Sequence, residues 1–303
     1  MGASSLYKLK TKTACFEIHP SAGGQWLGLV LASPVDGKPI SVVAGHKAPD
    51  PFFASGSFLM FPWVNRLEPN PWAREPFYPS THWLTDGNGI SLHGLYHNLP
   101  RFIEKEILSD TESYAEFSIE IPESWKGSLL SKIQIRECYV LHENELIIQY
   151  KLKNNSNDEF PFALGIHPYF RWNDDNRIDD LFLFGSGFYK IKLGDYLLPE
   201  RVNTDSLYFI TEETLNGKNL DDLYKKAGES TSFIGLMSMN RKETLIIQGG
   251  EYYQIYTPQD RKSIAIEPMT GTGNFLHFTG GNPNVLMPNE EKKIEFLIRL
   301  HCF

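Results

Sequence analysis

Cysteine and long apolar runs are the scarcest features of this 303-residue chain. Its three cysteines, Cys15, Cys138 and Cys302, are widely spaced and include no CxxC pair. This count excludes a disulfide framework and a zinc knuckle, and free thiols are typical of a reducing compartment. Residues 1–16 contain no apolar stretch of signal-peptide length, and no segment approaches membrane-spanning length. We therefore expect a cytoplasmic protein with no membrane partner.

Several chemical signatures are also missing. The sequence has no GxxxxGK[ST] or GxGxxG phosphate loop, no GxSxG nucleophile elbow and no HExxH zinc motif. His93 and His97 have the spacing of helical metal ligands, but Gly94 and Pro100 disfavour a helix between them. We expect neither a metal ion nor a cofactor.

Basic residues are too few and too scattered for nucleic-acid binding. The 29 Lys and Arg residues are dispersed among 37 Asp and Glu residues, for a net charge of -8. Surfaces that follow a phosphate backbone need clustered basic residues, so nucleic acid is excluded as a partner. Hydrophobic residues make up 41% and charged residues 22%, which is typical of a globular chain.

Alternation of apolar and polar residues is the dominant pattern that is present. It recurs at 114–121, 133–136, 148–153 and 294–300, with turn-rich sequence between the runs. Alternation with a period of two is typical of strands in antiparallel sheets with one buried face. Because the chain has no linker and no repeat, we predict one all-β domain, 1–303, folded as a large antiparallel β-sandwich with few short helices.

Four stretches depart from this alternation. Residues 51–100 are rich in proline and aromatics and are interpreted as an ordered wall of a binding cleft. Residues 162–172 form a dense polar and aromatic cluster, and 212–226 give the best helical signal, weakened by Gly217. The acidic stretch 174–180 is interpreted as a solvated loop.

Short polar clusters within aromatic sequence carry the candidate chemistry. They are Asn65-Arg66, Leu92-His93-Gly94, Gly165-Ile166-His167-Pro168-Tyr169-Phe170 and Ile266-Glu267-Pro268. A histidine and a glutamate suit acid–base catalysis near neutral pH, since burial can raise the pKa of a carboxyl toward that range. His97 is interpreted as a structural or rim residue, and Trp72, Trp83 and Trp125 are interpreted as core or loop packing.

These clusters, in this order and spacing, resemble the aldose 1-epimerase (galactose mutarotase-like) family over nearly the whole chain. The resemblance begins at Phe16-Glu17-Ile18-His19-Pro20 and ends at Leu286-Met287-Pro288. It implies a single β-sandwich, an isomerase of carbohydrate metabolism, and the interconversion of α and β anomers of an aldose. By analogy, His167 protonates the ring oxygen and Glu267 takes the anomeric proton.

The resemblance also implies a set of substrate-binding residues. Arg66, in Asn-Arg-Leu, and His93, in Leu-His-Gly, match residues that bind the sugar. Asp221 is the best match for an aspartate that holds hydroxyls, and Asp222 is almost as good. Arg66 could instead pair with Glu68 as a surface ion pair.

Aromatic and phosphate-binding roles complete the expected site. Trp63, Tyr96 and Tyr169 could stack on the apolar face of the sugar, and Arg171 could reach a phosphate. The expected partner is a small aldohexose or sugar phosphate, and the protein is expected to be a monomer or homodimer. The alternatives are a hexose-6-phosphate 1-epimerase, a non-catalytic carbohydrate-binding module, and a glycoside hydrolase or lyase. A hydrolase would use two carboxylates, for which only Glu267 and Asp221 are available.

Overall fold

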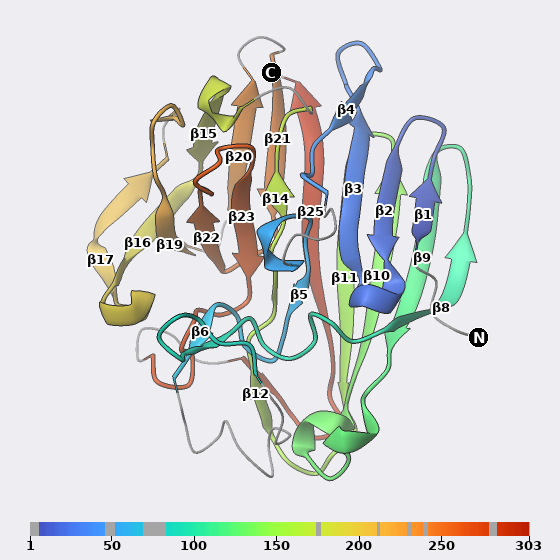
Figure 1. Ribbon diagram of the computed structural model, residues 1–303, viewed down its shortest axis with the longest axis vertical. Helices are drawn as coiled ribbons and strands as arrows, with labels where there is room; N and C mark the ends of the chain where they lie inside the picture. Colours follow the sequence, from blue (N-terminus) through green and yellow to red (C-terminus); the bar gives the residue numbers. More distant parts are fainter. Residues whose placement is uncertain are drawn as a thin grey trace.

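The computed structural model describes residues 6–45, 52–68, 83–173, 177–210, 213–228, 232–238, 242–278 and 284–302. Antiparallel strands dominate these residues (Figure 1), and the helices among them are single 3-10 turns. These turns are η1 (Pro20–Ala22), η2 (Phe52–Ala54), η3 (Glu123–Trp125), η4 (Leu129–Lys132), η5 (Ile178–Asp180) and η6 (Asp195–Leu197). The expected all-β sandwich is therefore confirmed.

A nine-stranded antiparallel sheet forms the rear layer in Figure 1. Its long central strands come from the alternating segments, whose inward side chains are buried and whose outward ones are polar. In spatial order the strands are β18 (Glu213–Thr214), β15 (Leu181–Gly185), β20 (Phe233–Ser238), β21 (Glu243–Gln248), β25 (Glu291–Cys302), β11 (Glu145–Asn154), β10 (Ile133–His142), β9 (Glu112–Ile119) and β8 (Arg101–Ile107).

Two further sheets lie in front of the rear layer (Figure 1). The larger has the order β17 (Pro199–Phe209), β16 (Gly187–Leu193), β19 (Asp221–Lys226), β22 (Tyr252–Tyr256), β23 (Ile264–Met269), β13 (Gly165–Ile166) and β5 (Leu59–Met60), with β14 (Tyr169–Phe170) also paired to β23. The smaller consists of β1 (Tyr7–Lys10), β2 (Cys15–His19), β3 (Gln25–Ala32) and β4 (Pro39–Ser41).

Two short pairs complete the fold: β6 (Arg66–Leu67) with β7 (Ser91–Leu92), and β12 (Phe160–Phe162) with β24 (Asn284–Leu286). The layers enclose one hydrophobic core that contains side chains from β1 through β25. Phe16 of β2, for example, packs against Tyr139 of β10 with ring centroids 4.7 Å apart. Burial of this apolar surface is the main source of stability.

The predicted helix over 212–226 is wrong. The described part of this segment forms β18 and β19, joined by a turn in which Gly217 has a φ of 67°. β19 lies between β16 and β22 and pairs with both. Sheet pairing therefore overrides the helical propensity of its Leu and Lys residues.

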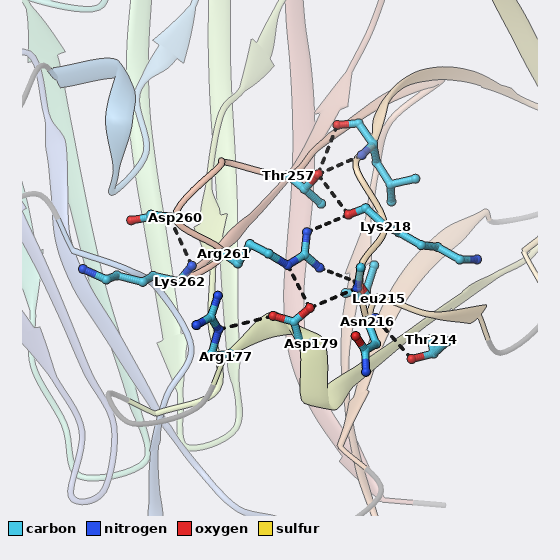
Figure 2. A network of polar contacts seen from close by, with 12 residues as sticks. Arg177, Asp179, Thr214, Leu215, Asn216, Lys218, Thr257, Asp260, Arg261 and Lys262 are labelled. Carbon is cyan, nitrogen blue, oxygen red and sulfur yellow. Dashed lines mark hydrogen bonds and ion pairs between the residues drawn. The ribbon is translucent and has the colours of Figure 1, made fainter.

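The acidic stretch at 174–180 is only partly a solvated loop. Asp174 and Asp175 lie outside the described residues, and Asp180 is exposed. Asp179 instead accepts hydrogen bonds from Arg261, Arg177 and the Gly217 amide (Figure 2). None of the described helices is long and apolar enough to cross a membrane.

Candidate active site

A pocket of about 770 Å³ is lined by strands of the larger front sheet and by loops beside it. It is lined by carboxyl, imidazole, guanidinium and amide groups from separate parts of the chain. The described lining residues are Phe53, Ala54, Asn65, Arg66, Leu84, Thr85, Asp86, Gly87, Leu92, His93, His167, Tyr169, Asp221, Gln254, Tyr256, Pro258, Gln259, Asp260 and Glu267.

His167 and Glu267 face one another within this pocket. Nε2 of His167 lies 3.2 Å from Oε1 of Glu267, and the two residues are 5% and 2% exposed. His167 directly follows β13, and Glu267 is in β23, the strand paired with β13. The imidazole is stacked between the rings of Phe58 and Tyr169, each with its centroid 4.9 Å away. Neighbouring strands and two aromatic rings thus fix the orientation of the pair.

Burial shifts both pKa values of this pair toward the neutral forms. It raises the pKa of Glu267 well above its ordinary value, and the nearby Asp221 raises it further while Arg66 opposes the shift. Burial also lowers the pKa of His167 to about 4. Oε2 of Glu267 is buried and has no hydrogen-bond partner among the described residues, which is unusual for a buried polar atom.

A chain of hydrogen bonds connects Arg66 to Asp221 across the pocket. Arg66 donates to Oδ1 of Asn65 over 3.3 Å, and the Asn65 amide donates to Oε1 of Gln254 over 3.3 Å. Gln254 in turn donates to Asp221 over 2.6 Å. Because each amide bridges two neighbours, the polar lining is held in one arrangement before any ligand binds.

Gln254 is the lining residue that the sequence interpretation missed. It is 2% exposed in β22 and lies directly opposite Glu267 in β23. The available signal was a single glutamine within the apolar run Tyr252-Tyr253-Gln254-Ile255-Tyr256. A buried polar side chain in such a run needs partners, which here are Asn65 and Asp221.

Alternation along β19 places Asp221 and Asp222 on opposite faces of the strand. Asp221 lines the pocket, whereas Asp222 pairs with Lys190 at 2.9 Å and does not line it. Burial raises the pKa of Asp221, against the opposing effects of the Arg66 charge and the Gln254 hydrogen bond.

Arg66 is held from two sides, and its ion pair is with Asp86 rather than with Glu68, the alternative considered from the sequence. Its Nε donates to Asp86 over 3.0 Å, in an ion pair whose side chains are 19% and 9% exposed. Its carbonyl accepts from the amide of Asn274, whose side chain also bonds the Glu68 backbone and carboxylate. Burial would raise the pKa of Asp86, but hydrogen bonds from Arg66 and from the amides of Ile90 and Asn88 outweigh it and lower that pKa.

His93 lies beside His167 in the pocket, with ring centroids 5.1 Å apart. Its Nδ1 is 3.2 Å from Sδ of Met60. Burial, followed by the electrostatic effect of the neighbouring His167, lowers the pKa of His93 well below its ordinary value, so His93 is neutral near pH 7. His93 and Asn65 have positive φ angles of 57° and 48°, a strained conformation that clusters at functional sites.

The expected stacking role is wrong for Trp63 and Tyr96. Both are fully buried and lie outside the pocket lining, so neither can contact a sugar there. Trp63 packs on Trp83 at 4.8 Å, and Tyr96 packs edge-on against Phe61 and Trp125. Tyr169 does line the pocket, but it stacks on the His167 imidazole, and its hydroxyl donates to the Phe53 carbonyl.

The remaining candidates lie away from the pocket. Arg171 donates to the Ser41 hydroxyl and is not part of the lining. His97 is also outside the lining, and burial lowers its pKa to about 4. The stretch 51–100 supplies ten of the lining residues, although 69–82, including Trp72, lie outside the described part of the chain. In the residues described, no three His, Cys, Asp or Glu side chains converge as metal ligands would.

The fold and the pocket place this chain among the large antiparallel β-sandwiches, and sequence comparison identifies its family. The model of the aldose 1-epimerase family matches residues 6–299, so the chain belongs to that family. No curated protein sequence matches this chain.

Solved structures share the fold at low sequence identity. A galactose mutarotase-like protein from Clostridium acetobutylicum is 15% identical, with 98% of this chain and 95% of that chain covered and a TM-score of 0.77. An aldose epimerase homologue from C. elegans is 16% identical, with 99% of each chain covered and a TM-score of 0.74. A galactose mutarotase-related enzyme from Lactobacillus acidophilus is 17% identical over 98% and 97%, with a TM-score of 0.68.

Proposed function

We propose that this protein interconverts the α and β anomers of an aldose by opening and reclosing the sugar ring. The supporting observation is the 3.2 Å contact between His167 Nε2 and Glu267 Oε1 inside a polar pocket. The anomeric hydroxyl and the ring oxygen are both bonded to C1. Two proton-transfer groups that touch one another can therefore reach both oxygens of a single sugar.

Ring opening needs one proton to leave the anomeric hydroxyl and another to reach the ring oxygen. Glu267 takes the first and His167 delivers the second, after which the C1–O5 bond breaks and an open aldehyde forms. Rotation about C1–C2 presents the other face of the aldehyde. Reclosure then returns both protons in the reverse direction and gives the opposite anomer.

The buried pair carries one proton in total throughout this cycle. Its resting form is neutral, with the proton on Glu267, because burial disfavours both charges. Moving that proton across the 3.2 Å contact produces the carboxylate and imidazolium that opening requires. The nearby Arg66 charge favours this shift, and no proton exchange with solvent is needed.

The rest of the lining would hold the sugar hydroxyls. Arg66 offers donors in a fixed fork, and Asp221 offers carboxylate acceptors. Hydrogen bonds through Asn65 and Gln254 hold Arg66 and Asp221 in fixed positions, so that little ordering is needed when the sugar binds. Neutral His93 can donate or accept from its position beside His167.

Optical rotation of freshly dissolved sugar tests the proposal. Purified protein is expected to accelerate the decay of rotation of α-D-glucose or α-D-galactose. Glu267→Gln is expected to abolish the acceleration while preserving the fold, since the amide fills the same space. Loss of one proton-transfer group typically costs about 10²–10⁴-fold in rate.

The two alternative functions, a binding module and a hydrolase, would give different results with the same sugars. A binding module would bind the sugar without accelerating mutarotation in either variant. A hydrolase would release reducing sugar from an oligosaccharide and leave the free sugar untouched. If neither free sugar nor glucose 6-phosphate is accelerated, the proposed activity is wrong for common hexoses.

A further inference from the structure

The turn between β22 and β23 forms one rim of the pocket. Its residues Pro258, Gln259 and Asp260 belong to the lining, and the last two are exposed. Asp260 forms no ion pair with any residue in the described part of the chain, and its Oδ1 accepts only the backbone amide of Lys262. A carboxylate therefore stands uncompensated at the pocket mouth.

Arg261, the next residue, fixes this turn to the body of the protein. Its Nε donates to Asp179 over 2.8 Å, and its two terminal nitrogens donate to the carbonyls of Lys218 and Leu215. Figure 2 shows the guanidinium enclosed by these three partners, with the side chain extending away from Asp260. Arg261 has a φ of 56°, and its amide bonds the Pro258 carbonyl, which closes a tight turn.

The same contacts fix the chain that leads into Asp221. The Thr257 amide donates to the Leu220 carbonyl, and the Thr257 hydroxyl accepts from the Leu220 amide over 2.8 Å. Hydrogen bonds thus join the turn to the segment that precedes β19 (Figure 2). The position of Asp260 at the mouth is consequently set by the fold rather than by a free loop.

The charges of the pocket are unbalanced among the described residues. Arg66 is the one permanent cation of the described lining, and Asp86 already pairs with it. Asp221 and Asp260 add two more carboxyl groups, while the resting Glu267 is protonated and adds no charge. A ligand that brings negative charge to this mouth meets net repulsion, because like charges in a cleft with low-dielectric walls are poorly screened.

We propose that Asp260, held at the rim by the Arg261–Asp179 contact, is a specificity-determining residue that selects uncharged aldoses over sugars carrying a phosphate. This proposal rests on the proposed function and names the substrate class of the same site. A phosphate ester carries about -1.5 to -2 charges at pH 7. It would have to enter past Asp260 without a described cation free to receive it.

Exchange NMR on glucose and glucose 6-phosphate tests the selection. The rate of α–β exchange is measured for each sugar, together with binding by ligand line broadening. The wild type is expected to favour glucose by about tenfold or more in kcat/KM. Asp260→Asn is expected to reduce that preference by about three- to tenfold, as loss of one charge at a partly screened distance implies.

Two further variants distinguish the effect of the Asp260 charge from the loss of a carboxylate elsewhere and from movement of the turn. Asp222→Asn removes a nearby carboxylate that lies outside the pocket and pairs with Lys190. The preference for glucose over glucose 6-phosphate should therefore not change. Arg261→Met leaves the Asp260 carboxylate in place but frees the turn. Arg261→Met is expected to reduce the preference for glucose over glucose 6-phosphate, and to raise KM for glucose more than it lowers kcat.

The outcomes separate this proposal from the catalytic one. An Asp260→Asn protein with the wild-type preference, or a wild type that prefers glucose 6-phosphate, overturns the selection. If neither sugar exchanges but binding still favours glucose and depends on Asp260, the catalytic proposal fails and the selection stands. If the wild type neither exchanges nor binds either sugar, both proposals are wrong.

Discussion

The proton shared by His167 and Glu267 decides how activity should depend on pH. The pair is competent while it holds one proton, and a second proton on His167 removes the acceptor. Because burial lowers the pKa of His167 to about 4, the second proton binds only in acid. We predict that the acid limb of kcat/KM lies well below the pKa of about 6.5 of an ordinary histidine.

This prediction is measured by polarimetry between pH 3.5 and 8, with the rate in protein-free buffer subtracted at each pH. Glu267→Gln run in parallel removes any contribution of buffer catalysis at the protein surface. An acid limb at or above pH 6.5 would show that His167 titrates as an exposed imidazole. The deep burial of the pair would then not govern its protonation.

Glu267 should also cost the protein stability. Its raised folded-state pKa means that the folded protein keeps a proton which the unfolded chain releases above about pH 4.3. The folded state then binds more protons than the unfolded state, so stability falls as pH rises through that window. We predict that Glu267→Gln stabilises the protein near pH 8 by about 0.5–2 kcal/mol, a typical gain at a strained functional site.

Urea unfolding of the wild type and of Glu267→Gln at pH 4 and pH 8 tests whether the substitution stabilises the protein. The advantage of the Gln variant should be small at pH 4 and grow toward pH 8. Glu143→Gln, a change at an exposed carboxylate, serves as the control for the loss of one charge. A Gln variant that is less stable at pH 8 would contradict the prediction.

At the scale of single elements, the sequence was informative where periodicity and motif agree. The alternation at 133–136 and 148–153 predicted strands that the structure has as β10 and β11. The polar motifs identified His167, directly after β13, and Glu267 in β23, the strand paired with β13 but far from it in sequence. The helix over 212–226 failed because pairing of β19 with two neighbours outweighs local propensity.

Burial was the property that the sequence did not reveal. Trp63 and Tyr96 sit beside site residues in the chain, yet both face the core. Alternation of side chains along a strand assigns faces but does not say which face meets a cavity. Gln254 was missed for the same reason, since its partners Asn65 and Asp221 come from distant segments.

A buried ion pair joins two strands of the nine-stranded sheet, β8 and β10. Arg101 of β8 and Glu137 of β10 pair over 3.0 Å with side chains 0% and 3% exposed. The hydroxyls of Tyr139 and Tyr150 also donate to Glu137. Removing one partner leaves an uncompensated buried charge, and we predict that Arg101→Met costs about 3–5 kcal/mol of unfolding free energy.

Chemical denaturation measures this cost, and two controls define it. Lys126→Met breaks an exposed pair with Glu123 and should change stability by less than about 1 kcal/mol. The double variant Arg101→Met, Glu137→Met removes both charges and should recover part of the loss. Equal losses of unfolding free energy in Arg101→Met and Lys126→Met would mean that burial of the Arg101–Glu137 pair does not increase its contribution to stability.

At the scale of the whole molecule, β25 connects the two halves of the chain. It lies between β11, which leads to the early strands β10, β9 and β8, and β21, which leads to the late strands β20 and β15. The core is continuous across this junction, from Leu9 to Leu300. We therefore predict that the chain unfolds as one cooperative unit, as expected of a single domain over 1–303.

The distribution of tryptophan allows this prediction to be tested without labels. All six tryptophans lie between Trp26 and Trp172, so fluorescence reports on the first part of the chain, while far-UV circular dichroism reports on strands throughout. The two urea curves should coincide. Phe296→Ala would leave a cavity at the centre of β25, where Phe296 is fully buried. It should lower the unfolding free energy by about 3–5 kcal/mol and shift both curves together. Curves that separate, or a variant that moves only one of them, would show that the halves fold independently and that β25 does not couple them.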